Sequence, residues 1–128
     1  VTFAGRTVSG WEMYRLPMED LRPLRFGAAG SEAPAAGGPG GLAVPAFYRG
    51  TFTVSDVGDT WLDLRGWGKG AVWVNGHNLG RFWEVGPQRT LYLPGPWLRR
   101  GTNEVVVLDL VPRGSYSLEG LSGALFDK

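Results

Sequence analysis

The chain has 128 residues, a formal net charge of +1, no cysteine and a single histidine. Its length and its hydrophobic content of 43% fit one folded domain with a core of its own. A charge so close to zero gives no footprint for nucleic acid or for an anionic membrane, and no apolar run reaches the ~18 residues of a membrane span. The composition excludes disulfides and cysteine- or histidine-rich metal sites, so we expect neither a metal nor another cofactor.

The sequence begins at Val1 without an initiator methionine and shows no secretory signal. We interpret it as a piece of a longer polypeptide, whose compartment, cytoplasmic or secreted, stays open. Within that polypeptide we expect residues 1–128 to form a single domain.

The first third of the chain contains one predicted strand and one long loop. Residues Val8–Leu16 carry aromatic side chains in a strand-like pattern, and Pro17 ends this strand because proline cannot donate to a ladder. Met18–Leu24 fits either a short helical turn or an extended edge. Residues 27–45 are rich in Gly, Ala and Pro and predict a long flexible loop between two strands.

The rest of the chain predicts short strands joined by tight turns. In a strand at Phe47–Val54, side chains alternate between the two faces, so Tyr48 and Phe52 share one face. Residues 55–59 have the composition of a turn. Asn75-Gly76 is a strong hairpin signal, because both residue types accept the positive φ of a primed turn. The hairpin strands are predicted at Ala71–Asn75 and Leu79–Trp83, and the other strands at Thr60–Arg65, Arg89–Leu93, Asn103–Val111 and Leu118–Phe126.

These seven or eight short strands, spaced by Gly and Pro turns, predict an all-β fold. No segment keeps a helical period over three turns. We therefore expect an antiparallel β-sandwich or jelly roll, with the apolar strand at Asn103–Val111 in a central, buried position.

Three motifs occur in a specific order, WVNG at 73–76, LGRFW at 79–83 and GPQRTLYLP at 86–94. With their flanking strands they resemble the C-terminal β-domain of family-35 glycoside hydrolases, the β-galactosidases. The resemblance is strong from about Ala46 to Val111 and weaker over Val8–Leu24. It implies a galactose-binding-domain-like jelly roll that packs beside a catalytic barrel.

Retaining hydrolysis of a β-galactoside needs two carboxyl groups about 5–5.5 Å apart. In the family those glutamates lie in the barrel, and no part of a barrel is recognisable in these residues. The resemblance therefore implies that this chain holds no catalytic residue.

Candidate binding residues surround the hairpin. Aromatic faces stack on the apolar face of a pyranose, and neighbouring polar groups bind its hydroxyls. The alternative for the tryptophans is packing in the core or at a domain interface, and the alternative for the histidine is a solvated turn residue. The candidates are Trp67, His77, Asn78, Arg81, Trp83, Glu84 and Trp97.

Other polar residues have structural interpretations. Asp63 and Asp109 are expected in ion pairs with arginines. The Gly66–Gly70 loop lacks the spacing of a phosphate loop and predicts a tight strand crossing with Lys69 exposed. The turn at 55–59 carries only two carboxylates, too few for a calcium shell.

Two main functions remain open at this point. The first is a non-catalytic accessory domain whose partner is the catalytic barrel of the same polypeptide. The second is an autonomous carbohydrate-binding module for galactose or galactan. A third reading, an autonomous hydrolase, lacks a recognisable pair of catalytic carboxylates.

Overall fold

The computed structural model describes residues 1–15, 17–28, 44–112 and 116–127. In these residues there is no helix long and apolar enough to cross a membrane. The described chain folds into strands and one short 3-10 helix, η1 (Gly95–Trp97). The strands are β1 (Thr2–Phe3), β2 (Arg6–Thr7), β3 (Ala46–Val54), β4 (Thr60–Asp63), β5 (Lys69–Val74), β6 (His77–Trp83), β7 (Thr90–Leu93), β8 (Gly101–Asp109) and β9 (Glu119–Leu121).

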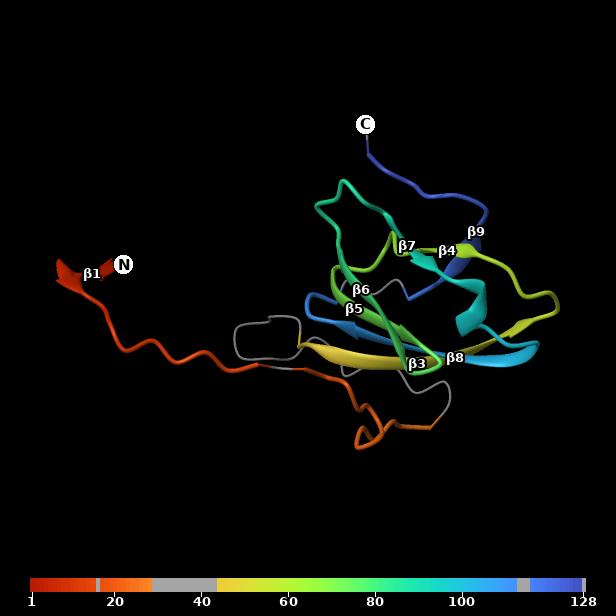
Figure 1. Ribbon diagram of the computed structural model, residues 1–128, viewed down its shortest axis with the longest axis horizontal. Coiled ribbons are helices and arrows are strands. Elements are labelled where there is room, and N and C mark those ends of the chain that lie inside the picture. Colours follow the sequence, from red (N-terminus) through yellow and green to blue (C-terminus); the bar gives the residue numbers. More distant parts are fainter. Residues whose placement is uncertain (16, 29–43, 113–115, 128) are drawn as a thin grey trace.

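Two antiparallel sheets form the body of the molecule (Figure 1). The larger sheet has the order β3-β8-β5-β6, and the smaller has the order β7-β4-β9. Every pairing within them is antiparallel. The predicted all-β antiparallel sandwich is confirmed, and β8 occupies the central position expected for its apolar sequence.

The core lies between the two sheets, because each sheet turns one set of alternating apolar side chains inward. The larger sheet contributes Val72, Val74 and Val107, and the smaller contributes Leu62 and Leu93, all at most 5% exposed. Tyr48 and Phe52 of β3 pack against this cluster together, as their predicted common face requires.

The β5–β6 hairpin has the turn that its sequence predicts. Asn75 has a φ of 49° and Gly76 a φ of 83°, so both central residues are left-handed, as a type I′ turn requires. Val74 pairs with His77 across this two-residue turn, which makes His77 the first residue of β6.

The outer face of the larger sheet carries a second, smaller cluster. Trp73, Val106 and Leu108 are buried there beneath residues 17–28. The open alternatives for Met18–Leu24 are resolved as neither helix nor strand but a turn, in which the Leu24 N–H donates to the Leu21 carbonyl. The side chains that pack on the cluster are Met18, Leu21, Phe26, Phe47 and Ala71.

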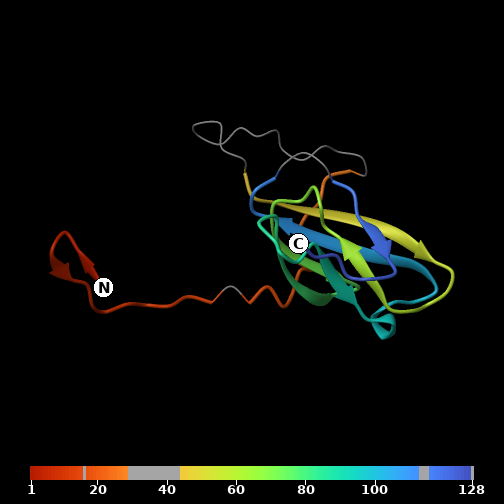
Figure 2. The same ribbon diagram turned by 90° about the horizontal axis from the view of Figure 1, so that it is seen from above.

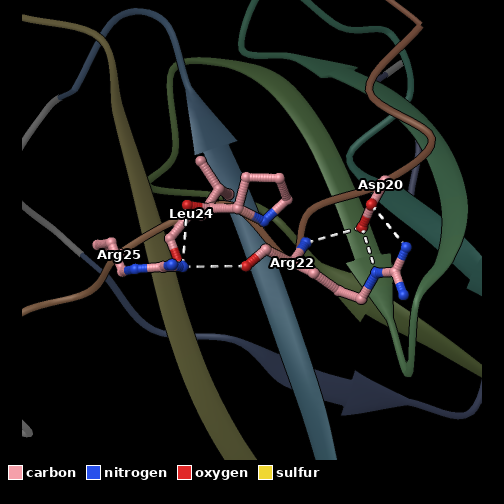
Figure 3. Close-up of polar contacts among 5 residues, drawn as sticks. Asp20, Arg22, Leu24 and Arg25 are labelled. Carbon is pink, nitrogen blue, oxygen red and sulfur yellow. Dashed lines mark hydrogen bonds and ion pairs between the residues drawn. The ribbon is translucent and has the colours of Figure 1, made fainter.

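Polar bonds within residues 20–25 hold this turn in shape (Figure 3). Asp20 accepts hydrogen bonds from the backbone and the guanidinium of Arg22. The Arg25 guanidinium donates to the carbonyl oxygens of Arg22 and Pro23. These local bonds fix the backbone that places Leu21 on the outer face.

The predicted strand at Val8–Leu16 is wrong for the residues that the structure describes. Residues 8–15 have no strand assignment, and the short β1–β2 hairpin precedes them. In both views this N-terminal part runs away from the sandwich, so no strand edge lies beside it (Figures 1 and 2). Most of the predicted loop at 27–45 falls on residues 29–43, outside the described residues.

The glycines of the 66–70 loop permit the tight crossing that was predicted. A Cβ placed on Gly70 would lie 1.7 Å from the Leu108 carbonyl oxygen, and one on Gly68 would lie 2.0 Å from the carbonyl oxygen of Val111. Both contacts are with backbone, which cannot swing away as a side chain can. The close approach of this segment to β8 therefore requires glycine.

We predict that Gly70→Ala lowers the free energy of unfolding by at least about 2 kcal/mol, because β5 and β8 must separate to admit the methyl group. The matched control is Gly50→Ala in β3, where a Cβ would meet only the Val105 side chain at 3.7 Å. Urea unfolding of both variants measures the difference. Equal stabilities would contradict the packing described here.

Candidate functional site

The structure places four of the seven predicted site residues, His77, Asn78, Arg81 and Trp83, on β6 and the other three on neighbouring segments. β6 is an edge strand of the larger sheet. His77 and Asn78 lie at its beginning and Trp83 at its end, about 20 Å away at ~3.3 Å per residue. Arg81 is exposed between them. The seven candidates therefore do not converge on one site.

A β-bulge shapes the start of β6. The register shifts opposite Val72 and Trp73, so that Leu79 has no partner on β5. The Asn78 side-chain oxygen accepts the backbone N–H of Gly80 at 2.7 Å. Asn78 thus has a structural bond within its own strand.

At the turn end, His77 stacks on Trp97. Their ring centroids are 4.7 Å apart and their planes are inclined by 13°. Trp97 is the last residue of η1 and is half-buried. One face of this indole is therefore occupied by imidazole and is closed to a sugar.

Asn75 and Asn103 hold this end together, and we call them the asparagine clamp. The Asn75 side-chain amide donates to Asn103 Oδ1 and to the Trp97 carbonyl, both at 2.8 Å, and its oxygen accepts the Glu104 N–H at 3.0 Å. Asn103 is fully buried. Its own amide donates to the carbonyl oxygens of Arg99 and Gly101.

The clamp joins three segments: the β5–β6 turn, the end of η1 and the start of β8. Neither asparagine was among the candidate site residues. The sequence carried a local signal for Asn75, which begins the Asn-Gly hairpin turn, but none for its partner Asn103, which lies 28 positions further along the chain.

We predict that Asn103→Ala lowers the free energy of unfolding by about 2–4 kcal/mol, since it removes the four hydrogen bonds of a fully buried side-chain amide. Thr102→Ala, one residue earlier on β8 and exposed, is the matched control and changes stability little. Thermal and urea unfolding measure both. If the two variants were equally stable, the clamp would not hold this end.

At the other end of β6, a cleft of about 110 Å³ brings together three of the candidates, Trp67, Trp83 and Glu84. Sequence reasoning missed three polar residues in its lining, Arg65, Gln88 and Arg89. No sequence motif singles these out, because they come from two separate loops. The cleft combines aromatic and polar groups, as sugar-binding sites do.

The two tryptophans of the cleft have different roles. Trp67 is 4% exposed, and its indole N–H donates to the Ser117 carbonyl at 2.8 Å, so it belongs to the core. Trp83 is 52% exposed. The Lys69 ammonium lies 4.0 Å from the centre of the Trp83 ring, which corrects the expectation of an exposed Lys69: it is half-buried against this indole.

Both arginines of the cleft are paired with carboxylates. Arg65 binds the Asp63 carboxylate at 2.6 Å, as the predicted ion pair of Asp63 requires. Arg89 donates to the Glu84 carbonyl and pairs with Asp127. The Arg89 guanidinium holds the pKa of the Asp127 carboxyl below its usual value.

Asp109 corrects a prediction, because its carboxylate binds backbone rather than arginine. It is fully buried at the end of β8 and accepts the N–H groups of Gly68, Lys69 and Val111 at 3.0–3.3 Å. A buried carboxylate surrounded by amide donors is stabilised in place. Asp109 therefore fixes the 66–70 crossing loop on β8.

The carboxylates of the 55–59 turn also have partners. Asp59 accepts the Tyr92 hydroxyl at 2.7 Å and the Gly95 N–H at 2.8 Å, while Asp56 pairs with Arg100 at 3.0 Å. Nowhere in the described ranges do three or more acidic, histidine or cysteine side chains come together as a metal site would require.

Acid should weaken the contacts of Asp59 and Asp63. The Arg65 guanidinium lowers the pKa of Asp63, and the Gly95 N–H with the Tyr92 hydroxyl lowers that of Asp59, both from an ordinary 3.8. A carboxyl with a lowered folded-state pKa contributes stability that is present above its ordinary pKa and lost as the pH falls through the lowered one. We therefore predict a decline in stability below about pH 4.

The Asp63→Asn variant should show a flatter decline between pH 4 and pH 2 in urea unfolding. Asp56→Asn is the control, because its ion pair is exposed and such pairs contribute little. Identical pH profiles for Asp63→Asn and the unmodified chain would contradict the prediction.

Two larger cavities lie away from the predicted residues of β6. One, of about 710 Å³, opens between the sheets along β3, where the Tyr48 ring stacks on Tyr116 at 4.4 Å. The other, of about 570 Å³, lies on the outer face beneath residues 19–26 and beside Trp73. Neither gathers the seven candidate residues, apart from Trp67 in the wall of the first.

This chain is similar in sequence to a known family and to several beta-galactosidases. The family described as "Beta-galactosidase, galactose-binding domain" matches residues 45–103. Beta-galactosidase-1-like protein 2 of Homo sapiens is 55% identical over 67 residues, which cover 52% of this chain. The beta-galactosidase of Bos taurus is 39% identical over 123 residues, and Beta-galactosidase 17 of Arabidopsis thaliana is 35% identical over 129. These two alignments cover 86% and 91% of this chain.

The chain spans only a small part of these relatives. It covers 10% of the human protein, 19% of the bovine one and 18% of the plant one. The matched family segment contains β3 to β7, η1 and both members of the asparagine clamp.

Proposed function

We propose that this chain is a non-catalytic accessory domain of a longer β-galactosidase-like glycoside hydrolase, because residues 45–103 match the galactose-binding domain of beta-galactosidases. In this proposal residues 1–128 hold a single jelly-roll domain. The catalytic carboxylates lie in a barrel elsewhere in the same polypeptide, and the domain packs on that barrel.

The match of residues 45–103 to the galactose-binding domain of beta-galactosidases carries the proposal, and the use of the aspartates supports it. A retaining glycosidase needs one carboxyl group with a raised pKa beside a second, ionised one. All six aspartates of the sequence form hydrogen bonds or ion pairs that hold loops and strands, and four of them have lowered pKa values. The six are Asp20, Asp56, Asp59, Asp63, Asp109 and Asp127.

Exposed apolar side chains near the small cleft support the packing role. Trp83, Val85 and Phe126 are 52%, 64% and 63% exposed. Their two segments are joined, because Gln88 pairs with Phe126 and the Arg89 N–H donates to the Leu125 carbonyl. We propose that this end of the sandwich faces the barrel.

Carbohydrate contact at the same cleft is the second candidate function, with galactose or galactan as ligand. The half-exposed Trp83 ring beside Glu84 favours it. The cleft volume of about 110 Å³ is well below the ~300–1,000 Å³ typical of small-molecule sites. Such a cleft accommodates part of one sugar ring, so binding would be weak.

We predict that the chain alone does not hydrolyse a chromogenic β-galactoside above the buffer rate, whereas the longer polypeptide does. The reason is that, in this proposal, the catalytic carboxylates lie in a barrel elsewhere in the longer polypeptide. A steady-state assay at matched concentrations measures both. Turnover by the chain alone would overturn the accessory role.

An NMR titration with galactose separates the two candidate functions. If the cleft binds sugar, the Trp83 indole signal shifts saturably at millimolar galactose, and Trp83→Ala abolishes binding while the domain stays folded. Trp11→Ala is the matched control, because Trp11 is also exposed and the segment that contains it, residues 1–15, runs away from the sandwich (Figure 1). The absence of any shift would leave the packing role alone.

A further inference from the structure

The first fifteen residues carry apolar side chains that nothing in the described chain covers. Trp11 is 70% exposed, Met13 92%, Tyr14 81% and Phe3 78%. Single exposed apolar residues are ordinary, but four large ones within twelve residues mark an interaction surface.

The backbone of this segment has few partners, and these lie within the segment, where the Val8 N–H donates to the Val1 carbonyl. β1 and β2 have two residues each, pairing Thr2 with Thr7 and Phe3 with Arg6. An isolated two-stranded hairpin is marginally stable in water. Residues 9–15 follow it with no strand assignment, and both views show the whole segment directed away from the sandwich (Figures 1 and 2).

The side-chain pattern is that of a strand with one buried face. In extended chain, Trp11 and Met13 point to one side, and Glu12 and Tyr14 to the other. The Tyr14 hydroxyl donates a hydrogen bond to the Glu12 carboxylate, so these two polar groups of one side are bound to each other. The apolar side is left for a partner.

We propose that residues 1–15 dock on another domain of the same polypeptide, where residues 8–15 add a strand to the edge of an antiparallel sheet and Trp11 and Met13 enter its core. The docking proposal rests on one part of the proposed function, namely that the chain is part of a longer polypeptide. Strand addition supplies the missing backbone partners and covers the apolar side in one step.

The comparisons support this choice of partner. At least four fifths of each of the three relatives lies outside the part that this chain covers. The alignment with the plant relative covers 91% of this chain, so it must reach into residues 1–15. Part of the segment is therefore aligned within a protein that is several times longer than this chain.

Hydrogen exchange tests the proposal. Amides of residues 8–15 should exchange within seconds in the 128-residue chain and at least a hundredfold more slowly in the longer polypeptide. Equal, fast exchange in both would overturn it. Slow exchange of these amides in the 128-residue chain alone would also overturn it. If that protection depended on protein concentration, the segment would bind a second copy of the chain; if it did not, the segment would bind the chain's own sandwich.

Two variants of the longer polypeptide sharpen the test. The double variant Trp11→Ala with Met13→Ala should restore fast exchange in residues 8–15, whereas Glu12→Gln on the opposite side should leave the protection intact. Equal protection in both variants would refute insertion of the apolar side. Exchange is read independently of galactoside hydrolysis, so an inactive polypeptide with a protected segment would contradict only the proposed function.

Discussion

The buried asparagine clamp is the constraint on which the turn end of this domain depends. Two amide side chains satisfy donors and acceptors from the hairpin turn, from η1 and from the start of β8. Amides suit this role, because each offers donors and an acceptor in one plane and carries no charge to desolvate. His77 and Trp97 stack as they do because the clamp fixes the backbone that bears them.

The other end of the domain is held by charge rather than by amides. Arg65 and Arg89 bind carboxylates beside the small cleft, and the buried Asp109 carboxylate binds three backbone N–H groups nearby. The contrast has a physical origin, since exposed guanidinium groups remain hydrated while Asp109 must be compensated by donors of its own. All three carboxylates thus hold neighbouring segments of the domain in place.

Local sequence signals predicted much of the fold. Asn75-Gly76 encodes its turn through two residues that accept positive φ, and the apolar run of β8 predicts a strand covered on both faces. The segment Val8–Leu16 was mistaken for a strand of this sandwich. Alternation of apolar side chains indicates that a segment can pair as a strand, but it does not show which sheet the segment joins.

The candidate site was harder to predict. Burial of Trp67 and the stacking of His77 on Trp97 arise from contacts between residues far apart in sequence. Arg89 and Asp127 meet across 38 positions, and no spacing rule connects them. Residue type thus identified groups able to contact a sugar, whereas only the fold shows which of them already have partners.

The bulge in β6 has a consequence for the behaviour of the domain at high concentration. An edge strand normally offers unpaired N–H groups to the edge of another molecule. Here the Gly80 N–H is already bound by the Asn78 side chain, and His77 and Arg81 add bulk and polarity along the same strand. This edge is therefore a poor template for growth of a shared sheet, which favours a solution of separate molecules over fibrils started from β6.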